Sequence, residues 1–216
     1  MSRDHVLDAL EQSKLVPVLR APSEDLALAA ADALVAGGIR ILEMTLTVPG
    51  ALSAMTRLRK RLDGTETLIG AGTVLTADQA SACIDAGAEF IVTPGLNVRL
   101  VEKLRERNVP IMPGALTPTE VITAWQSGAD MVKVFPCSAM GGASYLKSLK
   151  APLPNVKLFP TGGVKLENLG DYLSAGATVL GVGAALVDMG AVSAGTSDVL
   201  TDRAKAYVAA IAAHGG

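Results

Sequence analysis

Histidine and cysteine are scarce in this chain, and their scarcity limits its chemistry. The two histidines, His5 and His214, lie at opposite ends, so Ser-His-Asp, Cys-His and His-rich zinc sites have no central imidazole to use. The two cysteines, Cys83 and Cys137, form no CxxC pair and are too few to cross-link a domain of 216 residues, which indicates a reducing cytoplasm. Catalytic groups are therefore expected among Lys, Glu, Asp, Arg, Thr and Tyr.

Aromatic residues, excess charge and long apolar runs are also lacking. Aromatic side chains make up 3% of the chain and hydrophobic ones 50%, a balance typical of buried parallel strands under Ala-rich helices. A net charge of -2, with no basic run interleaved with aromatics, argues against nucleic-acid binding. The apolar runs fall short of the roughly 20 residues of a membrane helix, and the charged first residues do not resemble a signal peptide. We expect neither nucleic acid nor a membrane as partner.

Short apolar runs, each the length of a buried strand, recur along the chain. They begin near Leu15, Arg40, Leu68, Glu89, Pro110, Met131, Lys157 and Thr178. Helical patterns such as Glu24–Ala36 and Ala77–Ala86 lie between them. This alternation predicts an α/β fold, a closed (β/α)8 TIM barrel over one domain of residues 1–216. An extra N-terminal helix is expected over about Arg3–Ser13. A doubly wound open sheet is the alternative, but the first strand is not followed by a Gly-rich phosphate turn.

The ends of the expected helices carry recognisable residues. Polar N-caps are expected at Ser23, Thr76, Asn97 and Thr117. Left-handed glycines are expected to end helices at Gly37, Gly87, Gly128 and Gly176. The Gly/Ser/Thr-rich stretch 190–197 is typical of a loop before the last helix.

Lys133 is the most unusual polar residue of an expected strand. In Met131-Val132-Lys133-Val134-Phe135, the period-two pattern puts the two valines on the helix-facing side and Lys133 inside the barrel. An ammonium is costly in an apolar interior, and burial favours the neutral amine, which is the nucleophilic form. A lysine at the barrel mouth that reaches water or pairs with an acid is the alternative.

Glu43 has the same pattern in a second expected strand. It shares a face with Ile41 and Thr45, while Leu42 and Met44 form the apolar helix-facing side. An inward Glu and an inward Lys are either a structural ion pair or an amine nucleophile with its general acid–base.

Two glycine-containing turns end the last two strands. They are Thr161-Gly162-Gly163-Val164, which we expect to open a helix, and Gly181-Val182-Gly183-Ala184-Ala185. Glycine lets backbone amides approach an anion, and (β/α)8 barrels often bind phosphate after strands seven and eight. Simple tight turns are the alternative interpretation.

Together these motifs resemble the 2-keto-3-deoxy-6-phosphogluconate (KDPG) / 4-hydroxy-2-oxoglutarate (KHG) aldolases. The resemblance runs from about Leu15 to Leu186 and rests on Glu43 in LEMTL, on GAGTV at 70–74, on TPG at 93–95, on Pro113-Gly114, on Lys133 in VKVFP, on TGG at 161–163 and on Gly183. It implies a trimeric, cytoplasmic class I aldolase of the Entner-Doudoroff pathway. Such an enzyme cleaves the sugar phosphate to pyruvate and glyceraldehyde 3-phosphate and needs no metal or organic cofactor.

The resemblance also implies residue roles. Lys133 matches the Schiff-base lysine and Glu43 the general acid–base. The implied substrate-binding residues are Thr73 at the carboxylate, Pro94 and Phe135 as pocket walls, Thr161, and Gly162, Gly163, Gly183 and Ala184 at the phosphate. Two positions depart from the family pattern: Ala184 replaces a common serine, and Thr47 stands where many members have a carboxylate-binding arginine. Arg20, at the end of the first expected strand, is the nearest candidate to replace that arginine.

Other functions stay open on the sequence. An aldolase for the galactonate epimer would share every motif. A phosphate-binding barrel isomerase, or a non-catalytic sugar-phosphate-binding barrel, would share the glycine turns but would have no use for a buried amine.

Overall fold

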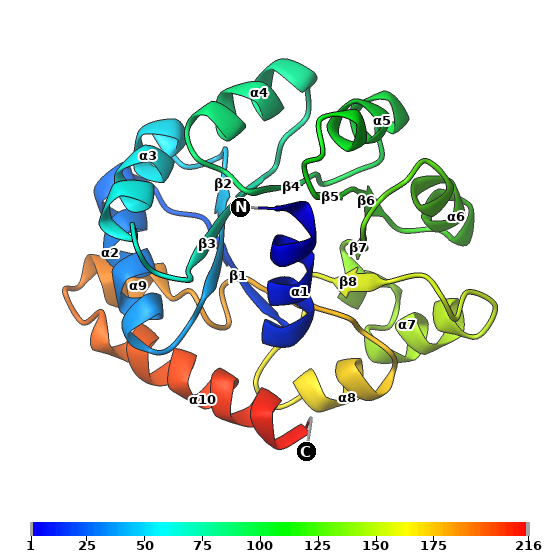
Figure 1. Ribbon diagram of the computed structural model, residues 1–216. Coiled ribbons are helices and arrows are strands. Elements are labelled where there is room, and N and C mark those ends of the chain that lie inside the picture. Colours follow the sequence, from blue (N-terminus) through cyan, green and yellow to red (C-terminus); the bar gives the residue numbers. More distant parts are fainter. Residues whose placement is uncertain (1, 215–216) are drawn as a thin grey trace.

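The computed structural model describes residues 2–214, an alternation of parallel strands and helices (Figure 1). The strands are β1 Leu15–Leu19, β2 Ile41–Thr45, β3 Leu68–Gly72, β4 Phe90–Val92, β5 Ile111–Met112, β6 Gly114–Ala115, β7 Val132–Val134, β8 Leu158–Pro160 and β9 Leu180–Val182. The helices are α1 Arg3–Ser13, α2 Glu24–Ala36, α3 Ala51–Arg61, α4 Ala77–Asp85, α5 Val98–Glu106, α6 Pro118–Gln126, η1 Cys137–Met140, α7 Ala143–Lys150, α8 Leu169–Ser174, α9 Met189–Ser193 and α10 Asp198–His214. A strand lies at each of the positions expected from the sequence.

The strands form a curled parallel sheet with helices around its outer side (Figure 1). One sheet has the order β5-β4-β3-β2-β1-β9 and another has the order β6-β7-β8. The β5 and β6 strands follow one another and are separated only by Pro113, which has no N–H to donate to a ladder. Isolated parallel bridges connect Leu158 with Ala177 and Thr161 with Gly181. The predicted α/β class is confirmed.

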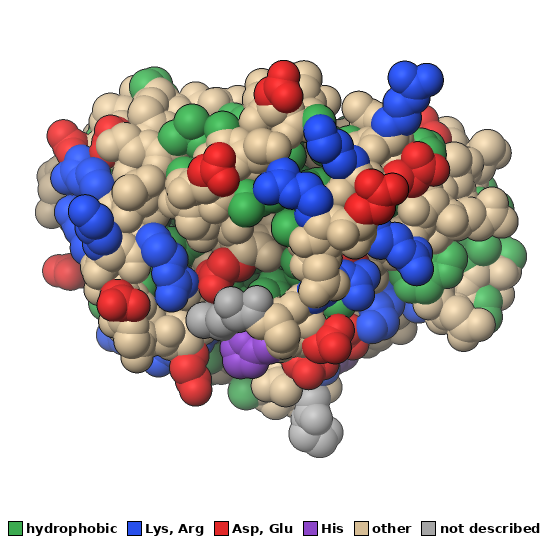
Figure 2. All heavy atoms as spheres, turned by 45° about the horizontal axis from the view of Figure 1, so that its top comes forward, with side chains coloured by type: hydrophobic (Ala, Val, Ile, Leu, Met, Phe, Trp, Pro, Cys, Tyr) green, Lys and Arg blue, Asp and Glu red, His purple; other side chains and the backbone are tan. Residues whose placement is uncertain are grey.

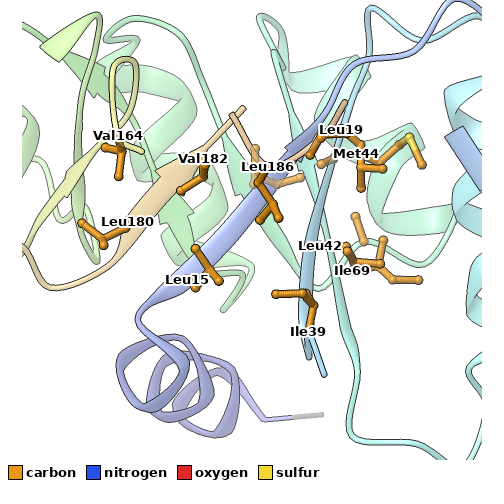
Figure 3. Packing of buried hydrophobic residues seen from close by; sticks show 14 of the residues in the cluster. Leu15, Leu19, Ile39, Leu42, Met44, Ile69, Val164, Leu180, Val182 and Leu186 are labelled. Atoms are coloured by element: carbon orange, nitrogen blue, oxygen red, sulfur yellow. The ribbon is translucent and has the colours of Figure 1, made fainter. Parts of the chain in front are cut away.

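Two hydrophobic layers follow from the alternation of side chains along each strand. The outer layer, between strands and helices, includes Leu42 and Met44. Figure 3 shows part of it, in which Leu19 of β1 is the register partner of Met44 and Leu42 is that of Ile69. The inner layer includes Ile41, Phe90 and Phe159 and fills the space enclosed by the curled sheet.

Helix α1 lies across the centre of the curled sheet, as Figure 1 shows. Its Val6 and Leu10 pack into the inner hydrophobic layer at the strand starts. Arg3 forms an ion pair with Asp130, whose other oxygen accepts a hydrogen bond from the Ile111 amide at 2.9 Å. Burial raises the pKa of Asp130. The expected extra helix is confirmed with its predicted bounds, and it covers the end of the interior opposite the strand ends.

The expected helix caps are mostly confirmed. Ser23, Thr76, Asn97 and Thr117 each accept a backbone hydrogen bond in the first turn of their helix. Helix α2 ends at Gly37 as predicted, but the expected left-handed conformation is wrong there: the φ of Gly37 is -82°, and Gly38 is the left-handed residue. Gly37 is also needed for packing, because a Cβ there would lie 2.4 Å from the Cβ of Ala204 on α10.

The loop expected over 190–197 is also corrected by the structure. Residues Met189–Ser193 form the short helix α9, which Asp188 caps by accepting a hydrogen bond from the Ala191 amide at 3.1 Å. Gly, Ser and Thr have low helix propensity, but Val192 is buried against the outer hydrophobic layer, and tertiary packing overrides the local preference.

The surface carries mixed charges. Figure 2 shows acidic and basic side chains interspersed over one face of the molecule. Over residues 2–214, the structure has no helix with the length and apolarity required to cross a bilayer.

Candidate active site

Lys133 and Glu43 meet inside the curled sheet. Lys133 lies on β7 and Glu43 on β2, and the Lys133 Nζ is 3.6 Å from the Glu43 Oε1. The two side chains are 3% and 0% exposed. Val132 and Val134 belong to the outer layer, so the predicted inward orientation of Lys133 is confirmed, as is that of Glu43. The structure thus joins two residues from distant parts of the chain into one buried ion pair.

The Glu43 carboxylate has few partners for a buried charge. Among the described residues, neither of its oxygens accepts a hydrogen bond. Its space is created by Gly72 on the neighbouring strand β3, where a Cβ would lie 2.0 Å from Oε1. A buried carboxylate without hydrogen bonds is costly and uncommon in a purely structural role. The arrangement can hold a proton and exchange it with a nearby group.

Phe135 lies next to this pair, and Thr161 directly follows β8, the strand that pairs with β7. The Lys133 Nζ is 5.3 Å from the centroid of the Phe135 ring, within cation–π distance. Thr161 is only 5% exposed, and its hydroxyl has no hydrogen-bond partner among the described residues. The inner face therefore offers an amine, a carboxylate and a hydroxyl whose hydrogen-bonding capacity is largely unused.

The three other threonines that the sequence singled out occupy different environments. Thr73 directly follows β3 with a φ of 60°, a strained conformation for a β-branched residue that is typical of functional sites. Thr45 is buried and donates to the Leu19 carbonyl at 2.8 Å. Its hydroxyl also lies 2.7 Å from that of the exposed Thr47. Thr47 thus belongs to a small hydroxyl network at the strand ends.

A cavity of about 600 Å³ opens at the carboxyl ends of β1, β8 and β9. The predicted site residues that line it are Arg20, Phe135, Thr161, Gly162, Gly163, Gly183 and Ala184. Pro94 lines a separate cavity of about 390 Å³ with Thr93 and Gly95. Thr47 and Thr73 line neither cavity in the described part of the chain. The structure therefore divides most of the predicted site residues into three groups: the buried Lys133–Glu43 pair, the residues of the larger cavity, and Pro94 in the smaller cavity.

The glycine turns offer backbone donors to the larger cavity. The amides of Gly163, Val164, Ala184 and Ala185 donate to no protein acceptor within residues 2–214. The prediction that a helix begins at Gly162 and Gly163 is wrong, because α8 begins only at Leu169. The α8 dipole therefore does not point into this turn, and anion binding there would rest on free amides and on the two cations that line the cavity, Arg20 and Lys165.

Arg20 is an exposed cation without a protein partner. It takes part in no salt bridge or hydrogen bond among the described residues. Its place in the cavity beside both glycine turns was not expected from the sequence, which located it only at the end of a strand.

Sequence reasoning also missed two residues near this cavity. Asp188 lines it, and Arg203 on α10 forms an ion pair with Asp188 at 2.9 Å. The only sequence signal for Asp188 was that Asp is a common N-cap residue, and this signal can be recognised only once helix α9 is known. A further cavity of about 450 Å³ lies at the strand starts, lined in part by His5, Arg40 and Glu66, and its polar lining residues are solvent-accessible.

Comparisons with known proteins point to one family. Residues 6–202 match the family model described as KDPG and KHG aldolase. The 2-dehydro-3-deoxy-phosphogluconate aldolase of Treponema pallidum is 38% identical over 169 residues, covering 78% of this chain and 80% of the relative. The KHG/KDPG aldolase of Escherichia coli K12 is 35% identical over 199 residues, 92% of each chain.

A solved structure shows the same architecture. The KDPG aldolase of Legionella pneumophila, with pyruvate captured as a covalent carbinolamine intermediate, superposes with a TM-score of 0.84 at 32% identity, covering 94% of this chain and 96% of that one.

Proposed function

Because this chain belongs to the KDPG and KHG aldolase family, we propose that it is a lyase that reversibly cleaves 2-keto-3-deoxy-6-phosphogluconate to pyruvate and glyceraldehyde 3-phosphate through a Schiff base on Lys133. The observation that carries the assignment of Lys133 is its buried contact with Glu43, 3.6 Å from Nζ to Oε1. A class I aldolase needs an amine nucleophile beside a proton shuttle, and both groups are present in one water-poor place.

The chemistry follows from these two side chains. The neutral Lys133 amine attacks the C2 ketone, and one proton of its nitrogen passes through Glu43 to the oxygen. A second proton, from the Glu43 carboxyl, lets this oxygen leave as water and gives an iminium and a Glu43 carboxylate. Glu43, through a water, then takes the C4 hydroxyl proton. The C3–C4 bond breaks, its electron pair moves into the enamine of pyruvate, and the aldehyde departs. Protonation at C3 and hydrolysis free pyruvate and restore the amine. No metal or organic cofactor takes part.

The phosphate of the substrate is assigned to the 600 Å³ cavity. The free amides of the turns at Gly162–Gly163 and Gly183–Ala184 support this assignment. Arg20 lines the same cavity, so we assign it to the phosphate rather than to the carboxylate. Phe135 and Thr161 line this cavity, and the Phe135 ring is 5.3 Å from the Lys133 Nζ, so both side chains would contact the carbon chain.

The substrate carboxylate is assigned to a position near Thr73 and Pro94, with the exposed Thr47 at the edge of this carboxylate site. The strained backbone of Thr73, directly after β3, supports a functional role there. The missing arginine at position 47 leaves hydroxyls and backbone amides as the donors for this anion.

The proposal extends to the assembly and setting of the enzyme. The parallel bridge between Thr161 and Gly181 and the short break at Pro113 support a closed (β/α)8 barrel, in one domain. Family membership supports a homotrimer, the Entner-Doudoroff pathway and cleavage of 4-hydroxy-2-oxoglutarate to pyruvate and glyoxylate as a second reaction. The free, buried Cys83 and Cys137 are in keeping with the cytoplasm.

Trapping with borohydride tests the proposal directly. Reduction in the presence of pyruvate should inactivate the protein and leave a stable adduct that peptide mass spectrometry locates on Lys133. Lys133→Met should not be trapped. An adduct on the exposed Lys147 or Lys165 instead, or full activity of Lys133→Met, would refute the mechanism and favour a phosphate-binding isomerase or a non-catalytic binder. Comparing both C4 epimers as substrates then separates the gluconate from the galactonate reaction.

A further inference from the structure

The cavity assigned to the substrate phosphate contains a carboxylate. Asp188 lines it together with Gly183 and Ala184. A hydrogen bond from the Ala191 amide, followed in strength by the charge of Arg203, lowers the pKa of Asp188, so this side chain is ionised at neutral pH. A negative charge beside a phosphate opposes binding unless a cation neutralises it.

Arg203 is that cation, and it lies on α10, far from the cavity residues in sequence. Its guanidinium donates to the Asp188 Oδ2 at 2.9 Å and to the Ala185 carbonyl at 3.4 Å. Arg203 is not among the described residues that line the cavity. Its two contacts therefore reach the turn 183–188 from the α10 side and connect the last helix to the phosphate end of the site.

Neither of the two cations that line the cavity, Arg20 and Lys165, forms an ion pair with Asp188 in the described chain. Lys165 lies 3.6 Å from the exposed Glu167, and Arg20 has no protein partner in the described chain. If Asp188 lost Arg203, its charge would oppose the phosphate directly and would compete for Arg20.

We propose that Arg203 is a positioning residue that determines specificity for phosphorylated substrates. It neutralises Asp188 and holds the Ala185 carbonyl, so that the turn 183–188 accepts an anion. This inference rests on the proposed function, because it presupposes that phosphate binds in this cavity. It assigns to α10 a role in substrate choice and none in the chemistry at Lys133.

Charge removal and charge rescue test this role. Arg203→Met should raise KM for the phosphorylated substrate, and the inhibition constant of inorganic phosphate, by about three- to tenfold, the effect of one partly solvated charge on a dianion. Deuterium exchange into pyruvate, which needs no phosphate, should keep its wild-type rate. Asp188→Asn retains the α9 cap, because Asn also caps helices. Combined with Arg203→Met, it should restore most of the phosphate inhibition, because only the longer contact with the Ala185 carbonyl is still missing.

Lys205→Met is the matched control. Lys205 lies on the same helix and pairs only with Asp202, at 3.2 Å, among the described residues, so its loss should leave all three measurements unchanged. If Arg203→Met slows pyruvate exchange and phosphorylated-substrate cleavage equally, or if Asp188→Asn fails to rescue it, Arg203 is only a structural residue and the inference is wrong. Wild-type protein that inorganic phosphate does not inhibit would instead overturn the phosphate site itself.

Discussion

The Glu43 carboxylate fills the space that a side chain at Gly72 would need. A Cβ at position 72 would lie 2.0 Å from Oε1, well inside van der Waals contact. The glycine is therefore a condition for placing the carboxylate beside Lys133.

Gly72→Ala should displace Glu43 without unfolding the protein, because the obstructed atoms, Oε1, Cδ and Cγ of Glu43, belong to a side chain and not to the backbone. We expect kcat to fall by about 10²-fold, the scale for moving a catalytic group by an ångström. Borohydride trapping at high pyruvate should persist, since Lys133 is retained. Gly170→Ala is the control, because a Cβ there has its nearest neighbour at 3.5 Å. Unchanged kcat in Gly72→Ala would show that Glu43 tolerates another position.

Glu43→Gln retains the size of the side chain but removes the base. If Glu43 shuttles protons, kcat should fall by roughly 10²- to 10⁴-fold, the usual range for a positioned acid–base. Steady-state kinetics and thermal unfolding should be measured together. A lower melting temperature with unchanged kcat would mean that Glu43 is only the structural partner of Lys133.

The phosphate turn is best probed at Gly183. Gly163 is unsuitable, because its φ is 83° and a Cβ would lie 2.4 Å from the Ser138 Cβ, so any substitution strains the fold. A Cβ at Gly183 meets open space. Gly183→Val should raise KM for phosphorylated substrate by roughly tenfold, the scale of one lost hydrogen bond to a charged group. Its unphosphorylated analogue should be unaffected, and equal losses on both substrates would speak against a phosphate site.

Arg20 offers a test of which anion lies near β1. Arg20→Ala should lower kcat/KM for the phosphorylated substrate on the order of 10- to 100-fold. Arg20→Lys should also be impaired, because an ammonium lacks the bidentate geometry of guanidinium. Pyruvate exchange should be unaffected if Arg20 binds phosphate. A loss of exchange would place Arg20 at the carboxylate, and no loss in either reaction would make it a solvated surface residue.

The sequence alone determined the features that depend on local periodicity and local chemistry. Strand positions, the inward orientation of Lys133 and Glu43 and the α1 bounds were predicted correctly, because side chains alternate along a strand whatever surrounds it. N-caps such as Ser23 and Thr76 were predicted because a cap acts within three residues of itself.

Only the tertiary structure decided the relations between distant residues. The order and curvature of the strands in the sheet decide three such relations, and no local sequence pattern encodes them. They are the Lys133–Glu43 distance, the space left by Gly72 and the position of Arg20 beside both glycine turns. At Gly37 the end of α2 was predicted correctly, but the contact with α10 and the left-handed conformation of Gly38 instead of Gly37 were not. Helix α9 forms because Val192 is buried, and burial is a property of the assembled chain rather than of the stretch 190–197.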